Sequence, residues 1–321
     1  MFINQMKKIL FICGSLNQTT QMHQVSRHLP DYDCCFSPYY GDGIVKVLAR
    51  RGLLDFTVLG GPFRQSTERY LQEHSCNIDH EGKSNNYELV VTCSDLIVQK
   101  NIRNKKVILV QEGMTDPENI TYHLVRTLSL PRYLASTSMT GLSHAYKKFC
   151  VASEGYRDLF IKKGVRAEKI VVTGIPNFDN VRQYLNNDFP YKNFVFVATS
   201  DTRETFKFDN RKAFLKKAAG IADGRQLIFK LHPNENFGRS AKEIEKFAPG
   251  SLVLTDGNAH HMVANCDTLI TQYSSLAFTG IALGKEVHSY FDLHMLRRLT
   301  PLQNEGSSGR KISDVCRSCL Q

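Results

Sequence analysis

The sequence predicts an α/β protein made of two tandem domains, each built on a mostly parallel sheet. Short apolar runs alternate with helical patterns along the whole chain, as in proteins whose helices cover parallel sheets. The 321 residues exceed what one hydrophobic core usually serves, and a hydrophobic content of 42% suffices for two cores. Gly174 and Pro176 interrupt the pattern, so we place the domain boundary there.

The expected strands are the apolar runs, each bounded by turn residues. In the first domain we place them at 8–13, 55–59, 89–92, 106–111, 149–152 and 169–173. In the second domain we place them at 194–198, 227–230, 252–254, 269–271 and 286–289. Two similar sheets in succession suggest two Rossmann-like domains, which we expect at 1–175 and 176–300, followed by a loop and a last helix at 301–321.

A histidine follows the expected strand at 227–230. Pro233 stops that strand, so His232 lies just beyond Lys230 at the strand's carboxyl end. Open α/β sheets bind ligands at this edge. A histidine in this position is usually a satisfied loop residue, and its functional alternative is a hydrogen-bond donor to a phosphate.

A pair of serines follows the expected strand at 269–271. Ser274 and Ser275 are suited to cap a helix at 276–283. A helix N-terminus with free N–H groups and serine hydroxyls binds anions, although such serines often only cap the helix. Together with His232, the serine pair predicts a phosphate-binding site whose donors contact the phosphate from two sides.

The stretch 266–275, with a helix of small residues after it, resembles the nucleotide-binding half of GT-B glycosyltransferases. The likeness is strongest to bacterial groups that use CMP-sugars and to CDP-glycerol glycerophosphotransferases. In those groups the histidine of the His-Pro pair and the two serines contact the nucleotide phosphates. The donor-binding residues that the resemblance implies are Lys230, His232, Pro233, Ser274 and Ser275.

The resemblance also implies a GT-B fold, with two Rossmann-like domains, an interdomain cleft, and a last helix that packs back on the N-terminal domain. GT-B enzymes place a donor-facing loop after the first strand of the second domain. Ser200 and Arg203 follow that strand here. An arginine can bind a phosphate through two hydrogen bonds, and its ordinary alternative is an exposed loop residue.

A carboxylate follows a buried strand of the first domain. Glu112 and Gly113 come directly after 106–111, so the carboxylate should face the ligand edge, with Gly113 allowing close approach of a ligand. A base at this place would accept a proton from an acceptor hydroxyl. The alternative is a loop cap or an ion pair with Lys105. Similar Glu-Gly pairs carry the base in bacterial sialyltransferases, whereas glycerophosphotransferases carry His-Gly there, which favours a sugar transferase.

Three further residues are expected to contact the acceptor. Gly14 and Ser15 follow the first strand, where the ordinary alternative is a strand-to-helix turn. Ser153 follows the expected strand at 149–152, and its simplest role is an N-cap.

We expect no metal and no cofactor, with the nucleotide-sugar as a substrate. The D-x-D string Asp31-Tyr32-Asp33 is the one pattern typical of metal-dependent transferases, and so short a string often arises by chance. The nine cysteines show no disulfide framework, which indicates reduced thiols in a cytoplasm. Cys316 and Cys319 would need two further ligands to hold zinc.

The formal net charge of +10 attracts phosphorylated donors and anionic membranes. We expect no nucleic-acid partner, because the basic residues are dispersed without a recognised motif. No apolar run is long enough for a transmembrane helix, so we expect a cytoplasmic protein that contacts the inner face of the membrane peripherally. The basic pairs that would make this contact, or else form solvated helix faces, are Lys147-Lys148, Lys162-Lys163 and Arg297-Arg298.

Together these features predict a metal-independent glycosyltransferase that moves a sugar, from a CMP-sugar by preference, to a hydroxyl of a bacterial surface glycan or glycolipid. Glu112 would act as the base and His232 would stabilise the departing phosphate. Three alternatives stay open: a CDP-glycerol-type glycerophosphotransferase, a UDP-sugar 2-epimerase of the same fold, and a non-catalytic nucleotide-sugar-binding protein. The sequence leaves open the donor sugar, the acceptor, the stereochemical outcome and the oligomeric state.

Overall fold

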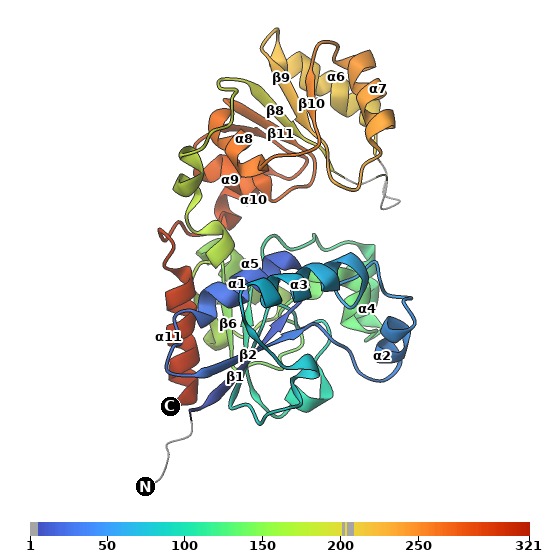
Figure 1. Cartoon of the computed structure of the whole chain (residues 1–321). Coiled ribbons are helices and arrows are strands. Elements are labelled where there is room, and N and C mark those ends of the chain that lie inside the picture. The colour runs from blue at the N-terminus through green and yellow to red at the C-terminus, as the bar shows by residue number, and fades with distance from the viewer. Residues whose placement is uncertain (1–5, 201–202, 204–208) are drawn as a thin grey trace. The chain divides into compact units, whose positions relative to one another are not determined.

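The computed structural model describes residues 6–200, 203 and 209–321, and the chain divides into two compact units (Figure 1). Unit 1 consists of Met1–Asp179 and Pro301–Gln321, and unit 2 of Asn180–Thr300. The division therefore falls after Asp179, slightly later than the boundary expected after Ile175. Each unit is an α/β domain around its own parallel sheet, which confirms the predicted fold class.

The sheet of unit 1 has seven strands in the order β3-β2-β1-β4-β5-β6-β7, all parallel. The strands are β1 (Lys8–Cys13), β2 (Asp33–Pro38), β3 (Asn77–Ile78), β4 (Leu89–Thr92), β5 (Lys106–Val110), β6 (Lys148–Val151) and β7 (Ile170–Val172). From β1 the strands β2 and β3 follow toward one edge of the sheet, and the strands β4 to β7 then follow toward the other edge. The carboxyl ends of β1 and β4 therefore flank the switch point at which open sheets bind ligands.

Helices cover both faces of this sheet, as a buried parallel sheet requires. The helices of unit 1 are α1 (Leu16–Ser26), α2 (Gly43–Arg50), α3 (Gly61–Glu73), α4 (Ile120–Thr127), α5 (Glu154–Lys163) and α11 (Ser308–Leu320). The short 3₁₀ segments are η1 (His80–Gly82), η2 (Lys100–Ile102), η3 (Arg132–Met139), η4 (Ala167–Lys169) and η5 (Pro176–Phe178). The core shows why β1 forms: its residues Ile9 to Cys13 are all fully buried.

One strand prediction in unit 1 is wrong, and two strands, β2 and β3, were not predicted. Residues 55–59 form no strand; they connect α2 to α3, and Phe56 leaves 79% of its surface exposed. The apolar residues of this segment line a cavity instead of forming a strand, as described below. Conversely, β2 was not predicted, because its sequence Asp-Cys-Cys-Phe-Ser-Pro carries polar residues and ends in proline. It pairs along the full length of β1, which overrides this weak local preference.

Unit 2 repeats the same topology with five parallel strands in the order β10-β9-β8-β11-β12. The strands are β8 (Val195–Ala198), β9 (Leu227–Lys230), β10 (Leu252–Leu254), β11 (Thr268–Thr271) and β12 (Glu286–His288). The helices are η6 (Val181–Leu185), α6 (Arg211–Ala222), α7 (Phe237–Phe247), α8 (Ala259–Asn265), α9 (Leu276–Ala282) and α10 (Leu293–Leu299). The switch point of this sheet lies between the carboxyl ends of β8 and β11.

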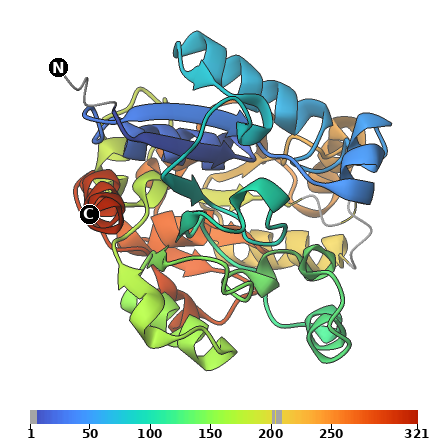
Figure 2. The ribbon, with the colours of Figure 1, turned by 90° about the horizontal axis from the view of Figure 1, so that it is seen from below.

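The C-terminal helix α11 belongs to unit 1, where it lies beside the strands and α1 (Figures 1 and 2). Asp179 accepts a 2.7 Å hydrogen bond from the Ser308 backbone N–H at the start of this helix. Burial raises the pKa of the Asp179 carboxyl. Ile312 and Cys316 are fully buried in the core, so Cys316 has a packing role. Among the helices in the described part of the chain, none is long and apolar enough to cross a membrane.

Candidate active site

Glu112 lies beyond β5, at the N-terminus of α1. Ser15 Oγ donates a 2.8 Å hydrogen bond to Glu112 Oε1, and Gln18 Nε2 donates a 2.6 Å hydrogen bond to Oε2. Ser15 is also the N-cap of α1, because its Oγ accepts from the Gln18 backbone N–H. The positive end of the helix dipole stabilises a carboxylate at this place. The expected partner Lys105 instead donates to Asn86.

Gly14 makes this arrangement possible. A Cβ at Gly14 would overlap the side-chain amide of Gln18, which is the group that holds Glu112. The Gly14 carbonyl also accepts a 2.7 Å hydrogen bond from Thr67, which fixes the turn between β1 and α1. Gly14 and Ser15 therefore position the carboxylate, and neither needs to touch a ligand to do so.

We expect Gly14→Ala to lower the free energy of unfolding by about 1–3 kcal/mol, because the added methyl overpacks the site and displaces Gln18. Gly220→Ala in α6 is the matched control, since a Cβ there meets no atom within 4 Å. The control should stabilise the protein slightly, by roughly 0.5–1 kcal/mol. Chemical denaturation of both variants makes the comparison. Equal effects of the two substitutions would show that Gln18 does not fill the space above Gly14.

A cavity of about 640 Å³ within unit 1 has Glu112 in its wall. The rest of the lining is mostly apolar: Tyr39, Val45, Leu48, Leu54, Phe56, Val58, Leu59, Phe63, Leu96, Ile97, Met114, Tyr133 and Leu134 belong to it. The polar side chains near the carboxylate include Ser15 and Gln18. A carboxylate has about four acceptor positions, and Ser15, Gln18 and, at 3.5 Å, Asn17 Nδ2 use three. Glu112 therefore keeps the capacity to accept a proton from a hydroxyl in the cavity.

Ser153 and Gly113 were also expected at this edge. Ser153 is buried and caps α5 by accepting from the Tyr156 backbone N–H. Gly113 does line the cavity, but a Cβ there would make only an ordinary contact with Phe178 at 3.5 Å. The position therefore does not require glycine for close approach. Asp33, from the D-x-D string, begins β2 and pairs with Lys8 at the opposite edge of the sheet.

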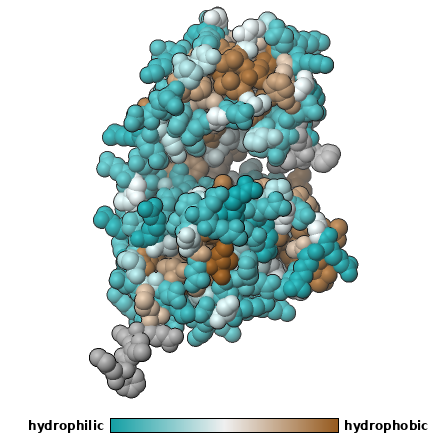
Figure 3. Space-filling view, in the orientation of Figure 1, coloured by the Kyte–Doolittle hydropathy of each residue, from teal (hydrophilic) through white to brown (hydrophobic). Residues whose placement is uncertain are grey.

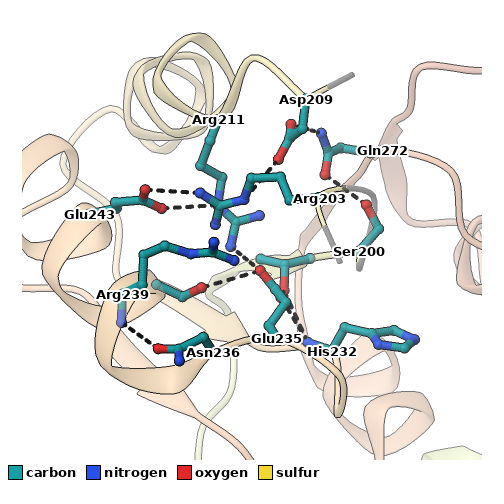
Figure 4. A network of polar contacts seen from close by, with 12 residues as sticks. Ser200, Arg203, Asp209, Arg211, His232, Glu235, Asn236, Arg239, Glu243 and Gln272 are labelled. Atoms are coloured by element: carbon teal, nitrogen blue, oxygen red, sulfur yellow. Dashed lines mark hydrogen bonds and ion pairs between the residues drawn. The ribbon is translucent and has the colours of Figure 1, made fainter. Parts of the chain in front are cut away.

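In unit 2, His232 follows β9 in a turn that Glu235 organises (Figure 4). The buried Glu235 carboxylate accepts from the His232 backbone N–H at 2.9 Å, from Thr199 Oγ1 and from Arg211. His232 Nδ1 accepts from the Asn234 backbone N–H at 3.2 Å. In the tautomer that this bond selects, the ring proton lies on Nε2.

Arg203 lies in an ion-pair network in the same unit (Figure 4). Its Nη1 donates to Glu243 at 2.9 Å, and its Nε lies 3.6 Å from Asp209. Arg211 pairs with Glu235 at 2.5 Å and reaches Glu243 at 4.0 Å. The expected phosphate contact of Arg203 would therefore compete with two carboxylates. Its ion pairs link Asp209 to Glu243 of α7.

Ser200 and the serine pair lie on either side of the switch point, after β8 and β11. Ser200 Oγ donates to Gln272 Oε1 at 2.8 Å, and Gln272 Nε2 donates to Asp209 at 2.8 Å (Figure 4). Ser274 Oγ accepts from the Leu276 backbone N–H at 3.3 Å, and within the described part of the chain no group accepts its own proton. Ser275 is the N-cap of α9 without a side-chain capping bond. The helix spans only seven residues and ends before Gly284, whose φ of 69° is left-handed.

Exposed aromatic rings stand at the same edge. The Tyr273 ring lies 5.5 Å from the Tyr290 ring and 5.2 Å from the Phe291 ring, both nearly perpendicular to it. Tyr273 and Tyr290 are exposed. Exposed tyrosine faces at a ligand edge are suited to stack on a planar base.

His232 and Ser274 do not lie on neighbouring strands, because β8 separates β9 from β11. Two strand spacings place the two strand ends roughly 10 Å apart. The Lys230 ammonium points to the other side of β9, where it donates to the Thr255 carbonyl oxygen at 2.9 Å. The two groups expected to contact the phosphate therefore lie more than one strand spacing apart. A phosphate contact of Lys230 would have to replace its hydrogen bond to Thr255.

Sequence reasoning missed the residues that hold the expected ones. Gln18 stands three residues after Ser15, in the S-x-x-Q spacing of a capping box, and this signal was available. Glu235 stands three residues after His232, but nothing in the sequence marks it as a buried carboxylate. Gln272 and Tyr273 directly precede the serine pair and share its place at the end of β11.

No family model and no curated protein matches the sequence. Solved structures do match it. A UDP-GlcNAc 2-epimerase from Neisseria meningitidis bound to UDP-GlcNAc superposes with a TM-score of 0.58 at 12% identity, covering 97% of this chain and 100% of that one. A co-structure of S. aureus MnaA with UDP gives 0.57 at 11% identity, covering 98% and 97%.

The wall teichoic acid polymerase TagF superposes more loosely, with a TM-score of 0.47 at 12% identity over 98% of this chain and 88% of that one. At such identities the likeness shows the fold alone. The chain has a GT-B fold, with two Rossmann-like domains.

Proposed function

We propose that this chain is a glycosyltransferase that uses a nucleotide-activated sugar, with Glu112 as the general base for an acceptor hydroxyl. One observation carries the proposal: two side-chain donors hold Glu112 in the wall of a cavity of about 640 Å³ within unit 1. An enzyme that converts a single nucleotide-sugar needs no second substrate. A transferase does, and this cavity has room for it.

In the proposed reaction, Glu112 removes the proton from the acceptor hydroxyl as its oxygen attacks the anomeric carbon of the sugar. The bond between that carbon and the nucleotide phosphate breaks, and the phosphate leaves with the electron pair. Ser15 and Gln18 fix the direction of the carboxylate, so less orientational freedom is lost in the transition state. Glu112 then releases its proton to solvent.

Unit 2 supplies the nucleotide site in this proposal. His232 donates from Nε2 to the departing phosphate, and Ser274 and Ser275 add hydroxyl donors. Tyr273 and Tyr290 offer faces for the base. We favour a CMP-sugar donor, since the His-Pro and Ser-Ser motifs resemble those of CMP-sugar transferases, and a glycan or glycolipid acceptor of a bacterial surface.

We expect cytidine nucleotides to raise the thermal midpoint of the protein more than uridine or guanosine nucleotides at equal concentration. A ligand that binds only the folded state stabilises it by about 2.7 kcal/mol at a hundredfold excess over its Kd. His232→Ala and the double variant Ser274→Ala, Ser275→Ala should each abolish the shift. Lys230→Ala is the matched control and should keep it, because Lys230 bonds to Thr255. A shift with UDP but none with CMP or CDP would contradict the cytidine donor.

A UDP-sugar 2-epimerase is the second candidate, and the strand order favours it. Because β8 separates His232 from Ser274, their strand ends lie roughly 10 Å apart, and a diphosphate spans that gap better than a single phosphate. Two of the structures that superpose on this chain, a UDP-GlcNAc 2-epimerase bound to UDP-GlcNAc and the MnaA co-structure with UDP, contain uridine nucleotides. Product analysis by NMR separates the two: epimerisation needs no acceptor and changes the configuration of the sugar, whereas transfer consumes an acceptor and releases the nucleotide.

A further inference from the structure

The helix α2 and the segment after it expose an unusual number of apolar side chains. None of the residues of α2 is buried, and Ile44 leaves 79% of its surface exposed. Val47 stands three residues later on the same side of the helix and is exposed as well. Leu53 and Phe56 continue the apolar surface beyond the helix. We call Ile44, Val47, Leu53 and Phe56 the α2 surface; Figure 3 shows apolar side chains at this edge of unit 1, where Figure 1 labels α2.

The α2 surface borders the mouth of the Glu112 cavity. Val45 and Leu48 of α2 line the cavity, and so does Phe56. Tyr133 and Leu134 of η3 also line it and are exposed, which places them at the opening. Monomeric proteins rarely leave so continuous an apolar surface in water unless something binds there. The same segment is therefore apolar toward the cavity and toward the outside.

Basic side chains accompany the apolar ones. Arg50 and Arg51 are exposed at the end of α2, and Lys46 pairs with Glu81. Asp55 is the one acidic residue between Gly43 and Leu59, so this segment is net positive. An apolar face flanked by arginines is typical of helices that lie in the interface of an anionic membrane. By contrast, Lys163, one of the basic residues first expected to face a membrane, is buried and donates to the Ser138 carbonyl oxygen.

We propose that the α2 surface docks into the headgroup region of an anionic lipid bilayer, so that the Glu112 cavity opens toward lipid. Given the proposed function, on which this step rests, the acceptor hydroxyl belongs to a molecule carried by a lipid. The charge of the α2 surface favours lipid docking over self-association. A two-fold contact between two copies would bring the arginines of both copies together, whereas anionic headgroups neutralise them.

Co-sedimentation with vesicles, without nucleotide, tests the docking. The wild-type protein should bind vesicles of phosphatidylcholine with phosphatidylglycerol and bind pure phosphatidylcholine more weakly. Phe56→Glu should lower the partition coefficient roughly tenfold or more, since it removes a phenyl ring from the apolar contact. Phe237→Glu on α7 of unit 2 is the matched control, because Phe237 is also exposed, at 54%. Ile44→Glu provides a second variant at the α2 surface.

Three results would overturn the docking: a wild-type protein that ignores both kinds of vesicle, Phe56→Glu and Ile44→Glu variants that bind like the wild type, or a dimer that Phe56→Glu dissociates while no vesicle binds. The nucleotide-induced thermal shift, measured on the same samples, reports on the proposed function separately. A wild-type protein that binds no vesicles but shows the nucleotide shift defeats the docking alone. Vesicle binding without any nucleotide shift defeats the proposed function alone.

Discussion

Glu112→Gln should lower turnover by roughly 10²–10⁴ while the fold and the nucleotide-induced thermal shift persist. The substitution removes the charge that accepts the proton and keeps the size of the side chain. It also keeps the site intact, because the Gln18 amide can turn and present its oxygen to the new amide while Ser15 still donates to the new carbonyl. Loss of activity would then report on proton transfer. Turnover is measured with saturating donor and acceptor.

Glu154→Gln is the control for this experiment, because Glu154 is an exposed carboxylate of the same unit that pairs only with Arg157 among the described residues. It should leave turnover unchanged. A Glu112→Gln enzyme that keeps more than about a tenth of the wild-type turnover would remove Glu112 from the role of base. Wild-type protein that binds nucleotides but turns over neither a transferase nor an epimerase substrate would favour a non-catalytic binding protein.

The sequence predicted the architecture because parallel sheets buried on both faces leave continuous apolar runs. β1, β4, β5 and β9 stand close to where their apolar residues indicate. The prediction failed where tertiary pairing or exposure decided the outcome. β2 forms because β1 offers it a full parallel partner, and residues 55–59 form no strand because they line a cavity and find no partner strand.

The candidate site was predicted in part for a related reason. Positions such as Glu112 and His232 follow strands, and strand ends can be located from an apolar run and a proline or glycine after it. The partners that orient them lie far away in sequence: Gln18 holds Glu112 across 94 residues. Such contacts depend on strand order. The same strand order places β8 between β9 and β11, so His232 and Ser274 lie farther apart than a contact with one phosphate from two sides requires.

Glu235→Ala should destabilise unit 2 by about 3–5 kcal/mol, because it leaves the Arg211 guanidinium buried without its main partner. The Glu235 side chain is fully buried and also accepts from Thr199 and from the His232 backbone, so the turn that carries His232 should loosen with it. For a unit of this size the loss corresponds to a drop of roughly 10–20 °C in the thermal midpoint.

Hydrogen-exchange mass spectrometry resolves this effect by unit. Peptides covering β8 and β9 should exchange faster in Glu235→Ala, whereas peptides covering β4 and β5 of unit 1 should not change. Glu235→Gln is the graded control: its amide oxygen can still accept from Arg211, so the loss should be smaller. Glu154→Ala removes an exposed pair and should change little, since such pairs contribute about 0–1 kcal/mol. Equal shifts for Glu235→Ala and Glu154→Ala would mean that water reaches Arg211 and screens its charge, so that the turn at His232 owes its order to the backbone rather than to the buried ion pair.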